Sequence, residues 1–366
     1  MPSEYNIYVY NPSGELQALI TDYTDFAIGR VVNGYDTLDI NIPYTSPSQP
    51  YMQMDYFIEI YRSNSQFGIP SYLEFSGLIH KTTFNYDRLK NWRVVAFGWE
   101  SLLARRLVAY NEDNPNKSNW NNKSASTIMY DMVNLNIGAG STTVGITDRA
   151  VSGIVSGFTF DADTLVGNIL HVADKAYENL LTALQDVALQ GDVDFEVVWN
   201  GGTSWTFRVG YPLLATDRSE IVKFSVDNGT IGSFTSVNDR TQYGTTAIVR
   251  GQGTANATVR RVRPATAPTG LDSREFFVEA SALGNNTTDM DDLGDAKLLT
   301  YTKKALSITT NIQQTPSNLY GLDYFIGDLV SVDIISSVEV LQVNQVTISV
   351  DSSGNEIVRV QLEYDN

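Results

Sequence analysis

The sequence predicts a mainly β protein with an inserted α+β region, and three observations support that fold class. Val, Ile and Thr are abundant, and 20 Tyr and 27 Gly are present, a composition typical of short strands joined by tight turns. Charged residues make up only 18% of the chain, whereas helical proteins usually carry more Glu and Lys. Apolar and polar residues alternate in several short segments, which is the pattern of strands with one buried face.

Residues 1–110 are expected to form a first β module. Each of its clearest strands is bounded by turn residues, and such strands at regular spacing indicate a small barrel or sandwich. A short amphipathic helix at 101–107 closes the module. The expected strands are 38–42, 57–61, 73–79 and 92–97.

Residues 111–210 are expected to form the inserted α+β region. The Asn-rich stretch 111–123 has no apolar period and reads as a loop or linker. Ser124 is placed to cap a helix, and a second helix around 180–188 ends at Gly191. The first helix carries one apolar face, formed by Ile128, Met129, Met132 and Val133. Strands at 193–199 and 205–209 follow as a hairpin.

Residues 211–366 are expected to form a second β module with one helix. The helix spans 288–305 and turns Leu293, Ala296, Leu299 and Thr300 to one side. The expected strands are 221–226, 245–251, 257–262, 275–279, 329–335, 339–350 and 357–363. No residue-level repeat links the two β modules.

Length and composition exclude several classes of protein. The 366 residues are enough for two to four domains, and 42% apolar residues exclude global disorder. No run of 18 uncharged apolar residues exists, and the first residues lack the pattern of a signal peptide, so we expect no membrane segment and no leader. The absence of Cys excludes disulfides, Cys-based zinc sites and thiol nucleophiles.

The candidate metal ligands do not form a convincing site. His80 and His171 lack the spacing of a metal-binding helix and are interpreted as satisfied or surface histidines. Residues 289–295 resemble part of a calcium loop, but Leu293 and Thr300 stand where two ligands are required. This segment is better interpreted as the acidic first turn of a helix. We therefore expect no metal.

Catalytic and cofactor motifs are also lacking. The segment Arg250–Asn256 begins like a dinucleotide loop, but a strand follows it, so Gly251 and Gly253 are expected to let a strand bend or approach another backbone. The carboxylate pairs Asp161/Asp163 and Asp192/Asp194 have no mark of catalysis among 42 acidic residues. No nucleophile elbow, P-loop or HExxH motif is present, so we expect no catalytic residue, no cofactor and no enzyme.

The charge of the chain argues against a sequence-reading nucleic-acid binder, because its net value is −17. The one basic cluster is better explained by a solvated strand face or by ion pairs with a partner subunit than by DNA contact. That cluster consists of Arg250, Arg260, Arg261 and Arg263.

Several segments resemble, in the same order along the chain, those of the tail hub proteins of long-tailed bacteriophages. The segment Gly98–Arg106 is similar to that family's G-x-D/E-x-L-x-L-L-x-R-R element. The helix at 288–305 is more polar than the family pattern, and the stretch 111–123 is a local elaboration. The other matching segments are 8–16, 75–79, 251–253, 274–280, 320–330 and 346–351. The resemblance marks as structural positions Arg105, Arg106, Gly251, Gly253, Gly327 and Asp328.

The resemblance implies a structural role in the virion. Tail hubs are homotrimers at the distal end of the tail tube, in which each chain supplies two tube-like β-barrel modules, so three chains match a sixfold tube. The implied partners are the tail tube or distal tail protein and a spike or fibre assembly. Genomic DNA passes through the channel without specific binding. Such a protein is assembled in the host cytoplasm.

Two other functions compete with the hub. The 20 Tyr and five Trp are compatible with a carbohydrate- or receptor-binding tail module, although strand-rich proteins bury aromatics as a matter of course. A cell-wall hydrolase requires an acid pair or metal triad that the sequence does not display. Residues 1–110, 111–210 and 211–366 carry −3, −7 and −7, so a trimer of −17 chains has a total of −51. We hypothesise that part of this charge faces the channel and repels DNA.

Overall fold

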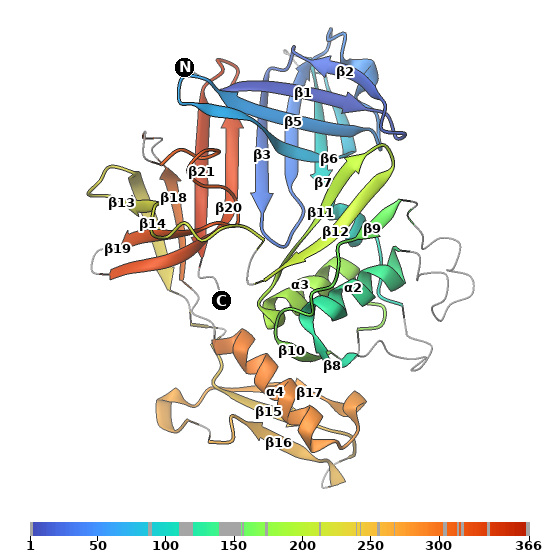
Figure 1. Cartoon of the computed structure of the whole chain (residues 1–366), viewed down its shortest axis with the longest axis vertical. Coiled ribbons are helices and arrows are strands. Elements are labelled where there is room, and N and C mark those ends of the chain that lie inside the picture. Colours follow the sequence, from blue (N-terminus) through green and yellow to red (C-terminus); the bar gives the residue numbers. More distant parts are fainter. Residues whose placement is uncertain are drawn as a thin grey trace.

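The computed structural model describes residues 3–86, 90–109, 120–138, 155, 157–172, 175–211, 214–238, 240–241, 243–254, 257–266, 268–302, 306–312, 315, 318–334 and 337–363. Strands dominate these residues, so the predicted mainly β class is confirmed. In Figure 1 the main sheet lies at the top, a layer with two helices lies below it on the right, and a small sheet with one helix lies at the bottom.

One sheet combines strands from the N-terminal and C-terminal parts of the chain. It contains 13 strands within the described residues. Its order is β14-β18-β21-β20-β3-β4-β7-β6-β5-β1-β2, and β19 pairs with both β13 and β20. Its strands are β1 (Glu4–Tyr10), β2 (Leu16–Ile20), β3 (Asp25–Val31), β4 (Thr37–Pro43), β5 (Phe57–Asn64), β6 (Ile69–Asn85), β7 (Asn91–Gly98), β13 (Lys223–Ser225), β14 (Ile231–Asn238), β18 (Leu306–Ile312), β19 (Leu329–Ile334), β20 (Ser337–Val350) and β21 (Glu356–Glu363).

Alternating apolar residues form the core of this sheet. Leu38, Ile40 and Ile42 on β4 are fully buried, as their spacing predicts. The sheet is curved. The rings of Tyr5 on β1 and Phe26 on β3 lie 4.8 Å apart although these two strands are not paired, which requires the sheet to bend back on itself. Closed barrels, expected from the sequence, remain a prediction.

The two ends of the chain are joined by the pairing of β3 with β20. This antiparallel pairing runs from Gln345 opposite Val31 to Val350 opposite Phe26. One hydrophobic core cluster accordingly contains side chains of β1–β7 together with side chains of β19–β21. The N-terminal strands β1–β7 and the C-terminal strands β19–β21 therefore stabilise each other.

The layer below the sheet comes from residues 120–210. It packs two helices against short strands, and the predicted hairpin is present as β11 and β12. The expected loop 111–123 is wrong at its C-terminal end, where residues 120–123 belong to the strand β8. They form a strand because they pair with β10 and bury Trp120. Residues 111–119 lie outside the described residues. The elements are β8 (Trp120–Ser124), α2 (Ala125–Asn136), β9 (Phe158–Phe160), β10 (Ile169–Val172), α3 (Leu180–Gly191), β11 (Asp194–Gly201) and β12 (Ser204–Gly210).

Ser124 begins α2 as predicted, since its side chain accepts a hydrogen bond from the backbone N–H of Thr127. Replacing Ser124 with Ala is expected to lower the free energy of unfolding by about 1 kcal/mol, because that N–H loses its partner. Urea unfolding measures this change. Ser352→Ala, in an exposed turn, is the control and is expected to have little effect. An equal loss in both variants would contradict the capping role.

The bottom unit comes from residues 246–302 and has its own small core. Two strands of its three-stranded sheet pack against the helix α4 (Thr287–Thr302). The expected buried face of this helix is wrong at one residue: Leu299 is 50% exposed and Leu298 is buried, because the face continues from Met290 and Leu293. Thr300 lies outside the residues whose side chains are described. The strands are β15 (Thr246–Arg250), β16 (Arg260–Arg263) and β17 (Glu275–Glu279).

Aromatic rings connect the main sheet to the layer below. Phe57 on β5 contacts Trp99 and Trp199 at ring distances of 5.0 and 5.5 Å, and Trp99 lies 5.6 Å from Trp205. The remaining short helices are α1 (Ser101–Ala104), η1 (Gln49–Tyr51), η5 (Gly270–Asp272) and η6 (Ser281–Leu283). Over the described part of the chain, no helix has the length and apolar character needed to cross a membrane.

Candidate functional site

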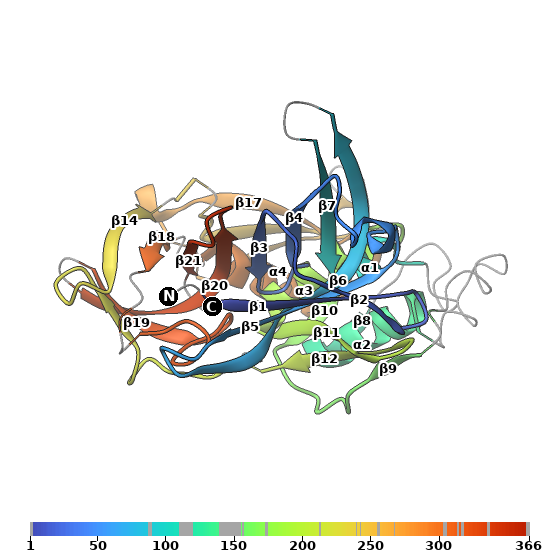
Figure 2. The same ribbon diagram turned by 90° about the horizontal axis from the view of Figure 1, so that it is seen from above.

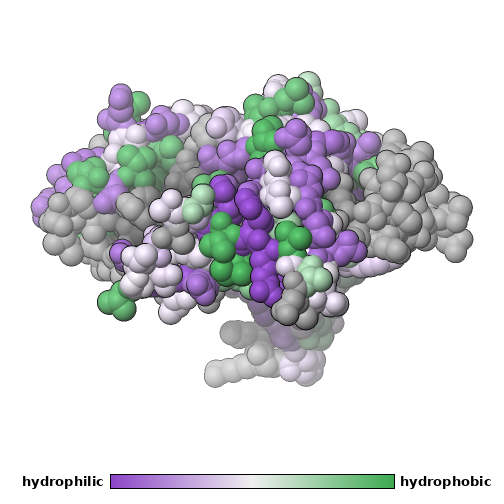
Figure 3. Space-filling view, turned by 90° about the horizontal axis from the view of Figure 1, so that it is seen from below, coloured by the Kyte–Doolittle hydropathy of each residue, from purple (hydrophilic) through white to green (hydrophobic). Residues whose placement is uncertain are grey.

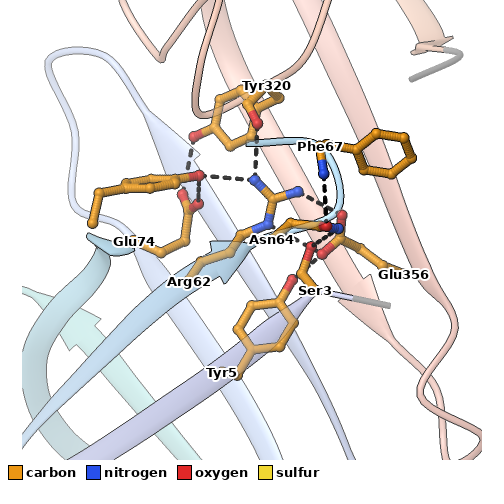
Figure 4. A network of polar contacts seen from close by, with 9 residues as sticks. Ser3, Tyr5, Arg62, Asn64, Phe67, Glu74, Tyr320 and Glu356 are labelled. Carbon is orange, nitrogen blue, oxygen red and sulfur yellow. Dashed lines mark hydrogen bonds and ion pairs between the residues drawn. The ribbon is translucent and has the colours of Figure 1, made fainter. Parts of the chain in front are cut away.

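A buried polar network ties the N-terminal strands to the last strand of the chain (Figure 4). We call it the Arg62 network, and it consists of Tyr5, Arg62, Tyr72, Glu74, Tyr320 and Glu356. Its members come from β1, β5, β6 and β21 and from the segment before β19. It therefore joins residues that are as far as 351 positions apart in the sequence.

Arg62 is the centre of the network and is 1% exposed. Its guanidinium donates to both carboxylate oxygens of Glu356, with Nε–Oε2 at 3.1 Å and Nη2–Oε1 at 2.6 Å. Its Nη1 donates to the hydroxyl of Tyr72 and to the backbone carbonyl of Tyr320, both at 2.9 Å. Tyr5 also donates its hydroxyl to Glu356. A paired fork of this kind is the geometry in which a buried arginine is best compensated.

Glu74 is the second carboxylate of the network and is fully buried. It accepts hydrogen bonds from the hydroxyls of Tyr72 at 2.5 Å and Tyr320 at 2.9 Å. Burial raises the pKa of Glu74, and the positive charge of Arg30 only partly offsets this. Burial likewise opposes ionisation of Glu356, but its hydrogen bonds to Arg62 and the positive charge of that residue outweigh burial and lower its pKa. The arrangement holds strands together and leaves no free base or nucleophile among these residues.

A cleft of about 160 Å³ lies where the main sheet meets β11. Arg30, Asp36, Glu100 and Asp194 line it. Arg30 Nε donates to Asp36 at 3.0 Å, and the backbone N–H of Val197 donates to Glu100 at 2.9 Å. Burial, together with the negative charge of Asp36, raises the pKa of Glu100 to about 8.

Asp194, the first residue of β11, lines the same cleft and accepts hydrogen bonds from other parts of the chain. It accepts from the side-chain amides of Asn33 at 2.8 Å and Gln342 at 3.1 Å, so it connects three separate parts of the chain. Within the described residues, no group of three or more His, Cys, Asp or Glu is arranged to hold a metal ion. The cleft is therefore interpreted as a junction between layers.

The six positions marked by the family motif are spread over three places. Arg105 is half-exposed, with Nη2 2.8 Å from His80 Nε2 and 3.6 Å from Asp55 Oδ1. The backbone carbonyl of Arg106 accepts from the N–H of Leu180 at the start of α3. These two residues therefore lie between the main sheet and the helical layer.

Gly251 and Gly253 lie in the bottom unit, close to other backbone atoms. A Cβ on Gly251 would lie 2.8 Å from the carbonyl oxygen of Gly284, and Gly253 has φ +125° with the carbonyl oxygen of Ala257 2.7 Å from the same point. This is the close backbone approach that the sequence predicts for the two glycines.

Gly327 and Asp328 immediately precede β19, and Asp328 connects this segment to residues 216–218 by hydrogen bonds. Asp328 is 2% exposed and accepts from the N–H groups of Thr216 and Phe325, both at 2.9 Å, and from Arg218 Nε at 2.7 Å. Gly327 has φ +86°, a conformation that favours glycine. The motif positions thus hold loops in place at separate points, and the structure does not gather them into one site.

The basic cluster is largely neutralised within the chain. Arg261 forms a two-bond pair with Asp291 on α4, with Nε–Oδ1 at 2.7 Å, and Arg263 pairs in the same way with Asp295. Arg250 lies 3.7 Å from Glu279. Asp291 and Asp295 of α4 are therefore paired with arginines of β16.

The two histidines and the carboxylate pairs have separate surroundings. His171 is 4% exposed, with Nε2 3.2 Å from Asp292. Asp163 accepts from Ser126 and Thr127 at the start of α2, and Asp192 follows the end of α3 in a left-handed conformation.

Sequence reasoning missed the Arg62 network, although one signal was present. Ile58, Ile60 and Arg62 follow each other at every second residue of one strand, so the period predicts that Arg62 points into the core. A buried arginine in turn predicts a buried acidic partner. Nothing local identifies Glu356 as that partner.

Comparisons with known proteins agree with this architecture. A family model described as siphovirus ReqiPepy6 Gp37-like protein matches residues 6–362. The 43 kDa tail protein of prophage MuSo2 from Shewanella oneidensis has the same fold, with a TM-score of 0.60 at 11% identity over 98% of each chain. A tail protein from Neisseria meningitidis MC58 also gives 0.60, at 11% identity over 99% of this chain and 97% of that chain. A chain of the Francisella PdpA–VgrG complex gives 0.55 at 12% identity, over 100% of this chain and 58% of that chain. Among curated proteins, none matches this chain.

Proposed function

The chain belongs to the siphovirus ReqiPepy6 Gp37-like family of phage tail proteins, and from that premise we propose that it is the structural hub that joins the tail tube to the tail tip. The observation that carries this proposal is the tie between the two ends of the chain. The β3–β20 pairing and the Arg62 network make two sequence-distant β modules into one body. A connector needs such rigidity, and catalysis plays no part in this role.

The hub proposal includes a specific symmetry. Each chain supplies two tube-like β modules, one built around β3–β7 and one around β18–β21, within the domains 1–110 and 211–366. Three chains then present six modules to a sixfold tail tube on one side and a threefold spike or fibre assembly on the other. Closed cyclic symmetry also covers strand edges that are open in a single chain.

The trimer is the first prediction of the hub proposal. Light scattering after size-exclusion chromatography is expected to give about 122 kDa, three times the 40.5 kDa of one chain, at micromolar concentration. In the virion, labelled antibodies are expected to mark the junction of tube and tip. A clean monomer at high concentration, or label along the whole tube, would contradict the proposal.

The same assembly gives the acidic charge a role. We place part of the −17 charge of each chain on the channel wall, where repulsion lets DNA slide past without adhering. The test is an image of the assembled ring at a resolution that identifies the residues lining its lumen. A neutral or basic lumen would overturn this part of the proposal and leave the connector role intact.

A further inference from the structure

The hairpin of β6 and β7 projects from the molecule as an arm. Residues 81–85 of β6 extend past the last residue that pairs with β5, and they pair with residues 91–95 of β7. On their other side, residues 91–95 pair with residues 39–43 of β4, so the free edge of the arm is that of β6. Figure 2 shows the outer end of this hairpin extending beyond the neighbouring strands. Figure 3, the view from the opposite side, shows that part of the molecule reaches beyond the outline of the rest. We call the described residues 81–86 and 90–95 the arm.

An aromatic cluster covers the arm and the neighbouring end of β4. Tyr86 is 75% exposed, Tyr44 is 51% exposed and Phe84 is 36% exposed. Phe84 lies at ring distances of 5.2 Å from Tyr44, 6.0 Å from Tyr86 and 4.9 Å from Trp92. These rings contact one another and lie outside the three core clusters, apart from Trp92, which packs against the main core. Exposed aromatic groups of this kind are typical of protein contact surfaces.

The arm is basic in an acidic chain. The arm contains three basic residues, Lys81, Lys90 and Arg93, and no acidic residue. Their net charge of +3 leaves −20 on the rest of the chain, whose total is −17. Arg93 is paired with Asp39, whereas Lys90 lies over the rings of Tyr86 at 4.4 Å and Tyr44 at 5.9 Å.

We propose that the arm docks on an acidic surface of a second copy of this chain. Charge complementarity identifies that partner, because each copy offers −20 to the +3 arm of its neighbour. Exposed carboxylates are present in all three regions, for example Glu4, Asp161 and Glu220. The aromatic cluster supplies apolar contact area, and Lys90 and its neighbours steer the approach.

This inference rests on the proposed homotrimer and adds the contact that holds it together. An arm that meets a different surface on the next copy makes a head-to-tail contact, and a head-to-tail contact repeated three times closes a ring. DNA is a less suitable occupant, because the acidic remainder of each chain repels phosphates near the arm.

The test compares two double variants of the full chain. Tyr86→Ser with Lys90→Glu removes the most exposed ring of the arm and reverses its neighbouring charge. Tyr211→Ser with Lys223→Glu makes the same changes elsewhere, at a 52% exposed tyrosine and a 47% exposed lysine. The arm variant is expected to raise the concentration at which half of the trimer dissociates by at least about tenfold at 0.15 M salt, and the control variant to leave it unchanged. Circular dichroism and thermal unfolding check that both variants fold.

Two further measurements, cross-linking and DNA binding, separate the outcomes. Zero-length amine–carboxyl cross-linking of mixed isotope-labelled and unlabelled chains is expected to join Lys81 or Lys90 to carboxylates of another copy. A trimer that resists dissociation equally in the arm variant would overturn the arm contact and leave the hub proposal standing, whereas a wild-type monomer would overturn both. Binding of a 30-nucleotide single-stranded DNA that the arm variant loses, with self-association unchanged, would overturn the protein contact in favour of nucleic acid.

Discussion

Replacing Arg62 with Ala is expected to destabilise the protein by about 3–5 kcal/mol, because it removes one partner of a buried ion pair and leaves the other charge uncompensated. Glu356 then keeps its hydrogen bonds from Tyr5 and Ser3 but loses its positive partner, and the hydroxyl of Tyr72 and the carbonyl of Tyr320 lose their donor. Urea unfolding at pH 7, followed by tryptophan fluorescence, measures the change. Trp99 and Trp199 report on the junction below the sheet, so their signal also shows whether the loss spreads there.

Arg93→Ala is the matched control for this prediction. Arg93 makes the same two-bond pair with a carboxylate in the same sheet, but its side chain is 53% exposed. An exposed pair contributes less than about 1 kcal/mol, because water compensates both charges after the change. Arg62→Lys keeps the charge but not the fork, and is expected to lie between the two. Equal losses at Arg62 and Arg93 would show that the network does not tie the two ends of the chain.

Local patterns in the sequence predicted many of the elements. The alternation in β4, the cap of α2 by Ser124 and the hairpin of β11 and β12 depend on residues only a few positions apart. The errors also have local causes. β8 is rich in Asn and looks like a loop, and it becomes a strand only because β10 is available to pair with it.

Long-range pairing was beyond the sequence patterns. β3 and β20 are each alternating strands, and nothing in either segment identifies the other as its neighbour more than 300 residues away. The same holds for the ion pairs of Arg261 and Arg263 with α4, which require β16 to lie against that helix. The charged residues were therefore visible as clusters, but their partners were not.

Replacing Glu100 with Gln is expected to stabilise the protein at pH 8 by about 4 kcal/mol and to have almost no effect at pH 4. Burial beside Asp36 raises the pKa of Glu100 to about 8 in the folded protein, whereas the ordinary value is 4.5. Below pH 4.5 the carboxyl is protonated in both the folded and the unfolded chain. Between pH 4.5 and 8 the unfolded chain releases this proton while the folded chain keeps it, so the free energy of unfolding falls as the pH rises.

Glutamine removes this pH dependence because it never ionises, and its side-chain oxygen still accepts the N–H of Val197. Urea unfolding of both proteins at several pH values between 4 and 8 isolates the contribution of Glu100 as the difference between them. Glu196→Gln is the control, since Glu196 lines the same cleft but is partly exposed and paired with Arg208. A difference between wild type and Glu100→Gln that stays constant with pH would show that Glu100 is ionised at pH 8 at no cost. The cleft would then be a solvated groove. The polar junction between the main sheet and β11 would contain an ionised Glu100 rather than a protonated one.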